Sequence, residues 1–263
     1  MNYILIDGSY YIFYRYYALN VWWKHACPED EVGHPYENEE FVEKFKKTFA
    51  SKIFEMEKKI GITDAIKIVG KDCPRKTIWR NEIFNKYKEN RENNTFLGSD
   101  FFKMVYQDNL YEAAGVSQVV SYPTLEADDC LAILSKNISQ NYPHSKIWII
   151  TSDHDYLQLA NENITIMNLK YKDLTQSKNS TGDAKSNKFC KIICGDKSDD
   201  IPGVFKRCGM KTAMKLYNNP DKFKEKLEKE AGSKERYILN QKLVDFDLIP
   251  DELVSGFLST IHI

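Results

Sequence analysis

The stretch Lys146-Ile147-Trp148-Ile149-Ile150-Thr151-Ser152-Asp153-His154-Asp155 combines an apolar run with two acids that follow it closely. An apolar run of this length between polar segments predicts a buried strand. Asp153 and Asp155 then lie in the loop at its carboxyl end. Asp and Ser are also ordinary turn residues, but two alternating acids can both reach a site at the end of a strand. We interpret His154 as a turn residue.

Four further apolar runs predict strands, at 3–6, 65–69, 117–121 and 164–167. Helical patterns lie between them, at 10–20, 39–60, 76–90, 100–114 and 126–140. Strands that alternate with long helices predict an α/β fold with a mostly parallel central sheet flanked by helices. Ligands bind such a sheet beyond the carboxyl ends of its strands, where Asp7, Asp72 and the two acids above are expected.

The sequence changes character after residue 171. Residues 172–188 are rich in Lys, Ser, Asn, Thr and Gly, which predicts a flexible loop. The pattern of residues 189–263 is helical throughout. We therefore expect an α/β core over residues 1–171, a loop, and a C-terminal helical region.

A predicted helix starts at Leu125-Glu126-Ala127-Asp128-Asp129 and has three acids in its first turn. Glu126 and Asp129, three residues apart, are neighbours on the helix surface, whereas Asp128 points elsewhere and is expected to serve a second ion or a bound water. Acids stabilise a helix N-terminus by roughly 0.3–1 kcal/mol each, but three in four residues exceed what capping needs. The cluster therefore predicts metal ligands.

Nine acids in five short clusters are candidate metal ligands: Asp7, Asp72, Glu126, Asp128, Asp129, Asp153, Asp155, Asp196 and Asp199. Carboxylates with open water positions are the ligands that Mg²⁺ and Mn²⁺ prefer. Two such ions roughly 4 Å apart can stabilise the attacking and leaving oxygens of a phosphodiester. The sequence therefore predicts a nuclease that binds two Mg²⁺ ions, for which Mn²⁺ can substitute.

The overall charge is close to balanced, with 37 Lys and Arg against 38 Asp and Glu. Without the nine candidate ligands, 29 acids face 37 bases, which suits a protein that binds a polyanion. The six cysteines form no CxxC pair and have no Cys/His zinc spacing, so we expect free thiols and an intracellular location. Neither a signal peptide nor a membrane-spanning segment is expected.

A basic stretch and a Gly-bearing turn are candidates for contact with phosphate. The first follows Asp72 and contains Arg75, Lys76, Arg80, Lys86, Lys88 and Arg91. Most of these are expected on a solvated helix face, and Lys88 and Arg91 are the candidates for electrostatic catalysis. The second is Gly195-Asp196-Lys197-Ser198-Asp199-Asp200-Ile201-Pro202-Gly203-Val204, followed by Gly209-Met210-Lys211-Thr212-Ala213. A Gly-bearing turn that opens a helix exposes N–H groups that can hold a DNA phosphate.

In this order, the motifs resemble those of the 5′ nuclease or flap endonuclease family of bacteriophages and of bacterial DNA polymerase I. The resemblance covers nearly the whole chain and rests on Ile6-Asp7-Gly8-Ser9, Tyr14-Arg15, Arg80, Tyr87-Lys88-Glu89-Asn90-Arg91 and the three acidic motifs quoted above. It implies a PIN-like nuclease core, a helical arch around residues 76–114 and a helix–three-turn–helix at residues 195–217.

By the same resemblance, the nine acids match metal ligands, and Lys88 and Arg91 match a basic pair on a helix over the active site. The matching DNA-binding residues are Arg80, Gly203, Gly209, Lys211, Thr212 and Lys215. The family also carries a K⁺ ion in the helix–three-turn–helix. Asp200 departs from the family pattern, because Asn is usual there.

The implied activity is 5′→3′ exonuclease or flap endonuclease cleavage of DNA at single-strand/duplex junctions. The implied partners are DNA with a 5′ flap, a nick or an RNA primer, and other replication proteins. The protein is expected to be a monomer that acts where a phage or its host replicates DNA. Two alternatives stay open at this point. One is a metal-dependent, RNase H-like ribonuclease, and the other is a catalytically silent protein that binds branched DNA.

Overall fold

The computed structural model describes residues 1–29, 33–90 and 96–261. Its centre is a five-stranded, wholly parallel sheet with the strand order β3-β2-β1-β4-β5. The strands are β1 (Asn2–Asp7), β2 (Ala65–Gly70), β3 (Gln118–Val120), β4 (Lys146–Ile150) and β5 (Ile164–Met167). All five expected strands are therefore confirmed, and β3 is shorter than its apolar run.

The order of the strands places a crevice beside β1. The chain builds β1, β2 and β3 toward one edge and then returns to add β4 and β5 on the other side of β1. Ile6 pairs in register with Val69 of β2 and with Ile150 of β4. The carboxyl ends of these three strands therefore lie side by side, at the position where open α/β sheets bind ligands.

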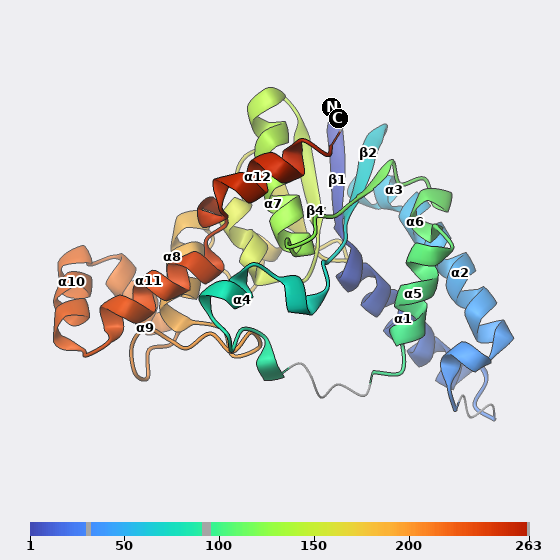
Figure 1. The fold of residues 1–263 in the computed structure, drawn as a ribbon. Coiled ribbons are helices and arrows are strands. Elements are labelled where there is room, and N and C mark those ends of the chain that lie inside the picture. Colours follow the sequence, from blue (N-terminus) through green and yellow to red (C-terminus); the bar gives the residue numbers. More distant parts are fainter. Residues whose placement is uncertain (30–32, 91–95, 262–263) are drawn as a thin grey trace.

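Helices cover both faces of the sheet (Figure 1). In β1, Tyr3 and Leu5 pack on one side and Ile4 and Ile6 on the other. The first side is covered by α7 (Ala127–Asn141) and α12 (Asp251–Leu258). The second is covered by α1 (Gly8–Ala26), α2 (Glu39–Phe54), α3 (Met56–Ile60), α5 (Ser99–Gln107) and α6 (Leu110–Ala113). This alternation explains why the strands are apolar throughout.

The C-terminal helices extend from one end of the molecule and then return to it (Figure 1). They are α8 (Ala184–Cys194), α9 (Met210–Tyr217), α10 (Pro220–Lys229) and α11 (Ser233–Val244). Val204 and Phe205 help form a separate apolar core among them. α12 instead packs on α7, where Phe257 is fully buried, so the last helix belongs to the α/β core rather than to the helical region expected over 189–263.

The segment after β2 differs most from expectation. One helix was expected over 76–90, but this segment forms short separate pieces: η2 (Arg75–Thr77), α4 (Arg80–Ile83) and a 3-10 turn at 89–90. Phe84 ends α4 in an extended conformation and Lys88 has a positive φ of 57°. Tertiary contacts override helix propensity here, because the Lys88 backbone N–H donates to the Asp199 carbonyl at 3.1 Å.

Other boundaries shift for local reasons. α8 starts at Ala184, inside the stretch expected as a loop, because Asp183 caps it by accepting from the Ser186 N–H at 2.8 Å. The helices expected at 39–60 and 100–114 are each divided in two, at Glu55 and at Asn109. The remaining short helices are η1 (Pro35–Glu37), η4 (His154–Leu159), η5 (Leu174–Gln176) and η6 (Phe246–Leu248). Among the described residues, no helix has both the length and the apolar character needed to cross a membrane.

Candidate active site

A cavity of about 360 Å³ opens at the carboxyl end of the sheet, beside β1. Five of the nine candidate acids line it and form the first acidic cluster: Asp7, Asp72, Glu126, Asp128 and Asp153. They come from the ends of β1, β2 and β4 and from the start of α7. Ser9, Tyr10, Phe13, Lys88, Ala127, Thr151 and Ser152 complete the lining. Strand ends that are far apart in sequence are thus brought together around one polar space.

The first turn of α1 positions Asp7. The Asp7 carboxylate caps the helix by accepting a hydrogen bond from the Tyr10 N–H at 3.0 Å, and it also accepts one from the Thr151 hydroxyl at 3.1 Å. Gly8 allows α1 to start against the end of β2, since a Cβ at this position would lie 2.6 Å from the Gly70 carbonyl oxygen. The close approach of backbone to backbone therefore requires glycine directly after the acid.

Asp72 links three elements at the mouth of the cavity. Its carboxylate accepts from the Ser9 hydroxyl at 2.5 Å and from the Ala127 N–H, in the first turn of α7, at 2.9 Å. The loop after β2 is therefore fastened to the starts of both α1 and α7. This arrangement holds the carboxylates of separate segments close to one another.

The lining acids repel one another electrostatically. Burial, and then the charge of Asp72, raises the pKa of Asp7 to about 7. Burial, and then the charges of Glu126 and Asp129, raises the pKa of Asp128 well above its ordinary value. Like charges held together in a buried place are stabilised by a bound cation. The donor set, carboxylate oxygens only, suits a hard divalent ion such as Mg²⁺ or Mn²⁺.

A second acidic cluster contains Asp155, Asp196 and Asp199, each of which offers an oxygen within 4.8 Å of the others. The turn that carries two of them depends on Gly195, whose φ is +69° and where a Cβ would lie 2.4 Å from the Ile201 carbonyl oxygen. Asp196 and Ile201 close the loop with reciprocal backbone hydrogen bonds of 2.9 and 2.8 Å. Asp153 and Asp155 therefore contribute to different clusters, although they are two residues apart.

Lysine ammonium groups lie against both clusters. Lys88 Nζ forms ion pairs with Glu126 of the first cluster and, at 3.7 Å, with Asp199 of the second. Lys191 Nζ, from α8, forms ion pairs with Asp155 and Asp196. Positive charge is thus held where the acids would accept metal ions. Lys88 marks the boundary between the two clusters.

Asp129 and Arg80 form a buried pair next to the acids that line the cavity, although neither residue is part of the lining. Arg80 is 2% exposed, and its two terminal nitrogens each lie 2.7 Å from an oxygen of Asp129, which is 0% exposed. Trp79 Nε1 also donates to Asp129 at 3.0 Å. The expectation that Arg80 contacts DNA does not fit this buried position. Glu126 and Asp129 are neighbours, as expected, and both pair with Arg80. Asp128 points elsewhere and lines the cavity, and each of the three acids offers an oxygen within 4.8 Å of the others.

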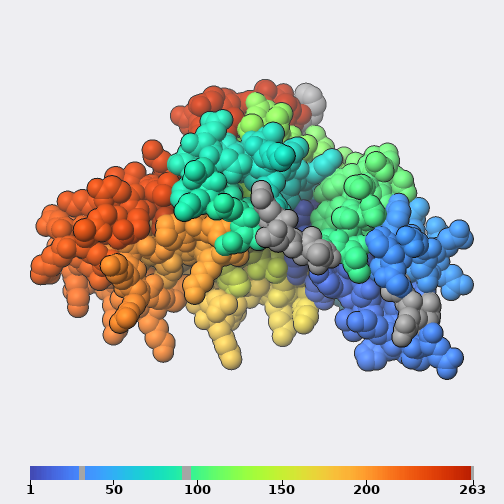
Figure 2. Space-filling model, turned by 60° about the horizontal axis from the view of Figure 1, so that its bottom comes forward, coloured from blue at the N-terminus to red at the C-terminus, as the bar shows by residue number. Residues whose placement is uncertain are grey.

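Of residues 195–217, expected as a helix–three-turn–helix, 195–209 form turns and only the last part is helical, as α9; the helix before these turns, α8, ends at Cys194. Lys211, Thr212 and Lys215 are exposed on α9, which starts directly after exposed Gly209. Gly203 is half-buried beside the end of α8. In Figure 2 the orange part of the helical region lies beside the teal segment that follows β2. Arg91, expected beside Lys88, lies outside the described residues.

Asp200, which stands where the family usually has Asn, has a distinct backbone conformation and its own hydrogen-bond partners. Asp200 adopts a positive φ of 60°, a conformation that Asn and Asp tolerate better than most residues. Its carboxylate accepts hydrogen bonds from the backbone N–H, at 2.9 Å, and from the side chain of Asn90. The loop 195–201 is therefore docked on the segment that carries Lys88.

Three contributors to the site had no clear sequence signal. Thr151 and Ser9 bind Asp7 and Asp72, and only their position next to conspicuous acids could have suggested this. Lys191 lies five residues before Asp196, a spacing that does not place two helical residues on one face. Its role depends on the turn at Gly195.

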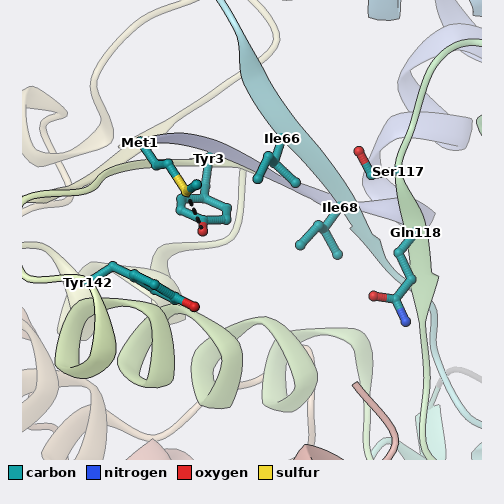
Figure 3. A pocket seen from close by; sticks show the side chains of 7 residues that line it. All are labelled: Met1, Tyr3, Ile66, Ile68, Ser117, Gln118 and Tyr142. Atoms are coloured by element: carbon teal, nitrogen blue, oxygen red, sulfur yellow. Dashed lines mark hydrogen bonds between the residues drawn. The ribbon is translucent and has the colours of Figure 1, made fainter. Parts of the chain in front are cut away.

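A second cavity, of about 310 Å³, lies near the amino-terminal ends of β1 and β2, away from the acids (Figure 3). It is lined by Met1, Tyr3, Ile66, Ile68, Ser117, Gln118 and Tyr142. Inside it, the Tyr3 hydroxyl donates to the sulfur of Met1 at 3.3 Å. No carboxylate lines this space, so the chemistry expected from the sequence belongs to the acidic cavity.

Known proteins share this sequence pattern and fold. A 5′-3′ exonuclease of Buchnera aphidicola (subsp. Acyrthosiphon pisum) is 30% identical over 93% of this chain and 86% of its own length. The ribonuclease H of phage T4 is 28% identical over 77% of this chain and 70% of its own. A 5′-exonuclease of phage T5 with bound zinc has a similar fold, with a TM-score of 0.69 at 21% identity over 99% of this chain and 98% of its own.

A flap endonuclease of phage T5, crystallised with DNA and metal ions, has the same TM-score of 0.69 at 18% identity, over 99% of this chain and 97% of its own. The family model described as the 5′-3′ exonuclease, N-terminal resolvase-like domain matches residues 2–189, which include every acidic residue of the first cluster. The chain belongs to this family of 5′-3′ exonucleases.

Proposed function

We propose that this 5′-3′ exonuclease cuts DNA at single-strand/duplex junctions and acts as an exonuclease or flap endonuclease that requires two Mg²⁺ ions. One observation carries the proposal. Two groups of carboxylates, gathered from the ends of three strands, the start of α7 and the turn 195–201, lie on either side of Lys88. A protein that only binds branched DNA has no evident use for so many acids, which repel one another in a buried site.

Each of the two acidic clusters would bind one metal ion. Asp7, Asp72 and Asp128 would hold one ion, with Glu126 and Asp153, and the cluster of Asp155, Asp196 and Asp199 would hold the other. Such ions supply an activated water and charge stabilisation at the phosphoryl group. Asp129 acts through Arg80, which holds the start of α7 in place.

Lys88 is the basic side chain best placed to contact the scissile phosphate. Its ammonium lines the cavity and reaches both acidic clusters. Burial would lower its pKa, but Glu126 and Asp128 outweigh this and raise it, so Lys88 remains charged and can stabilise negative charge that develops on the phosphate. We assign the same electrostatic role to Arg91 on the basis of sequence alone.

Duplex binding is assigned to α9 and the turn before it. Lys211, Thr212 and Lys215 are exposed there, and a helix N-terminus with basic neighbours suits a phosphate backbone. A K⁺ ion held by backbone oxygens between α8 and α9 belongs to the same proposal. The relatives include DNA polymerase I of several bacteria, which favours a role in replication, such as the removal of flaps or primers. That the protein acts as a monomer is part of the proposal.

The ribonuclease alternative is favoured by one relative, the phage T4 protein named ribonuclease H. Metal chemistry at the cavity does not by itself distinguish ribose from deoxyribose. Matched flaps made of DNA and of RNA separate the two, because an RNA-specific enzyme would leave the DNA flap intact.

The first prediction is metal-dependent cleavage of a 5′-labelled flap, a nicked duplex and an RNA-primed duplex, followed on one gel. Cleavage is expected with Mg²⁺ or Mn²⁺, to stop with EDTA and to resume when excess Mg²⁺ is added, because no side chain replaces the ions. Cleavage that persists in EDTA would contradict the two-ion proposal. If all three substrates remained uncut in Mg²⁺, the assignment as a nuclease that acts at DNA junctions would be contradicted.

The second prediction concerns pH. Burial and Asp72 raise the pKa of Asp7 to about 7, so the proton and the divalent ion compete for this carboxylate near neutral pH. At limiting Mg²⁺ the cleavage rate is expected to rise as pH increases from 6 to 8, and a higher Mg²⁺ concentration should shift the midpoint to lower pH. Rate profiles at two Mg²⁺ concentrations test this. A midpoint that does not move with Mg²⁺ would exclude the competition.

A further inference from the structure

Lys191 occupies the second acidic cluster in an unusual way. It projects from α8, its side chain is 23% exposed, and its ammonium forms ion pairs with Asp155, which is 15% exposed, and with Asp196, which is 18% exposed. Asp199 offers a third oxygen in the same small space. The lysine therefore contacts the oxygens that a divalent ion would need.

We propose that Lys191 is an internal counter-cation of the second cluster, which a divalent ion must displace from Asp155 and Asp196 in order to bind there. An ammonium and a metal ion compete because both need the same carboxylate oxygens and because like charges repel at short distance. The proposal rests on the proposed two-ion function. It adds that the protein itself sets the affinity of the second ion.

Three observations support the competition. The Lys191 ammonium contacts Asp155 and Asp196, two of the three carboxylates whose oxygens lie within 4.8 Å of one another. Lys191 is one turn from Gly195, whose backbone fixes the loop that carries Asp196. In the described part of the chain, Asp7, Asp72 and Asp153 have no ion-pair partner.

The two clusters are therefore expected to differ in their affinity for a divalent ion. The first presents several carboxylates without a lysine counter-charge, apart from Lys88 at Glu126. The second is already neutralised in part by Lys191. Without DNA, the first ion is expected to bind tightly and the second weakly.

The variant Lys191→Met tests this, with Lys188→Met as a matched control on the same helix. Lys188 pairs with Asp245 at 3.0 Å and with Asp247 at 2.7 Å, outside the acidic clusters. Mn²⁺ binding without DNA is followed by electron paramagnetic resonance, and thermal unfolding is measured in EDTA and in Mn²⁺. Neither measurement depends on cleavage.

In Lys191→Met, the second Mn²⁺ is expected to bind roughly tenfold or more tightly than in the unmodified protein, because a neighbouring positive charge is removed. Its Tm in EDTA should fall by several degrees, because Asp155 and Asp196 lose their counter-charge, and Mn²⁺ should restore more of the Tm than in the unmodified protein. Lys188→Met should leave the affinity of the second Mn²⁺ unchanged.

Second-site affinity that is unchanged or weaker in Lys191→Met, with the first Mn²⁺ still bound, would overturn the proposal for Lys191 alone. A protein that binds no Mn²⁺ at either cluster would overturn the metal centre itself. Lys191→Arg keeps the positive charge and should keep second-site binding weak, so it decides the question if the Met variant does not fold. Tight second-site binding in the Arg variant would also overturn the proposal.

Discussion

The variant Asp153→Ala is expected to lower the rate of Mg²⁺-dependent cleavage by on the order of 10³-fold while DNA binding remains measurable. Asp153 lines the acidic cavity at the end of β4, so its removal takes away a metal ligand. Its carboxylate also caps η4 by accepting from the Asp155 N–H at 2.9 Å. The substitution therefore also loosens the turn that supplies an acid to the second cluster.

The measurement is the single-turnover rate on a labelled flap, together with DNA affinity from fluorescence anisotropy in EDTA. Asp173→Ala is the matched control, since Asp173 caps η5 in the same way, by accepting from the Thr175 N–H at 2.8 Å, and does not line the cavity. The control should retain the full rate. Full activity in Asp153→Ala would mean that the cavity is not the catalytic site.

The variant Arg80→Met is expected to lose about 3–5 kcal/mol of unfolding free energy, because removing one partner of a buried ion pair leaves an uncompensated charge. Asp129 would lose its paired contacts of 2.7 Å and keep a carboxylate that is 0% exposed. Glu126 would lose a 3.1 Å partner and retain Lys88. The start of α7, which carries the central acids, should therefore be the first part to loosen.

Urea unfolding followed by circular dichroism measures this loss. Arg75→Met, an exposed arginine five residues earlier, should change the unfolding free energy by no more than about 0.5 kcal/mol. If Arg80→Met were as stable as Arg75→Met, Arg80 would not be the buried partner of Asp129. In that case a surface role for Arg80 would have to be reconsidered.

The acids at the strand ends could be predicted because the relevant rule is local. An apolar run predicts a buried strand, and the carboxyl ends of parallel strands share one edge of a sheet. Asp7, Asp72 and Asp153 follow such runs and line the same cavity. Asp196 and Asp199 follow no strand, so the rule of strand ends does not place them beside the other acids.

The roles of the basic residues could not be obtained in this way. Arg80 and Lys88 lie in the same basic stretch, yet one is buried against Asp129 and the other lines the cavity. A regular helix would have given this stretch a repeating face, but the chain leaves α4 at Phe84 and Lys88 takes a positive φ. Hydrogen bonds to the loop 195–201 determine this path, and those partners are more than 100 residues away.

The sequence by itself determined the parallel sheet, the edge at which ligands bind and the acidic chemistry of that edge, because hydrophobic periodicity and strand direction act over a few residues. Only the tertiary structure decided which charges meet: Asp129 with Arg80, Lys191 with Asp155, and Lys88 between two clusters. These pairs join positions 36 or more residues apart in sequence. The energy of each depends on burial and distance in the folded chain, and no local pattern encodes either.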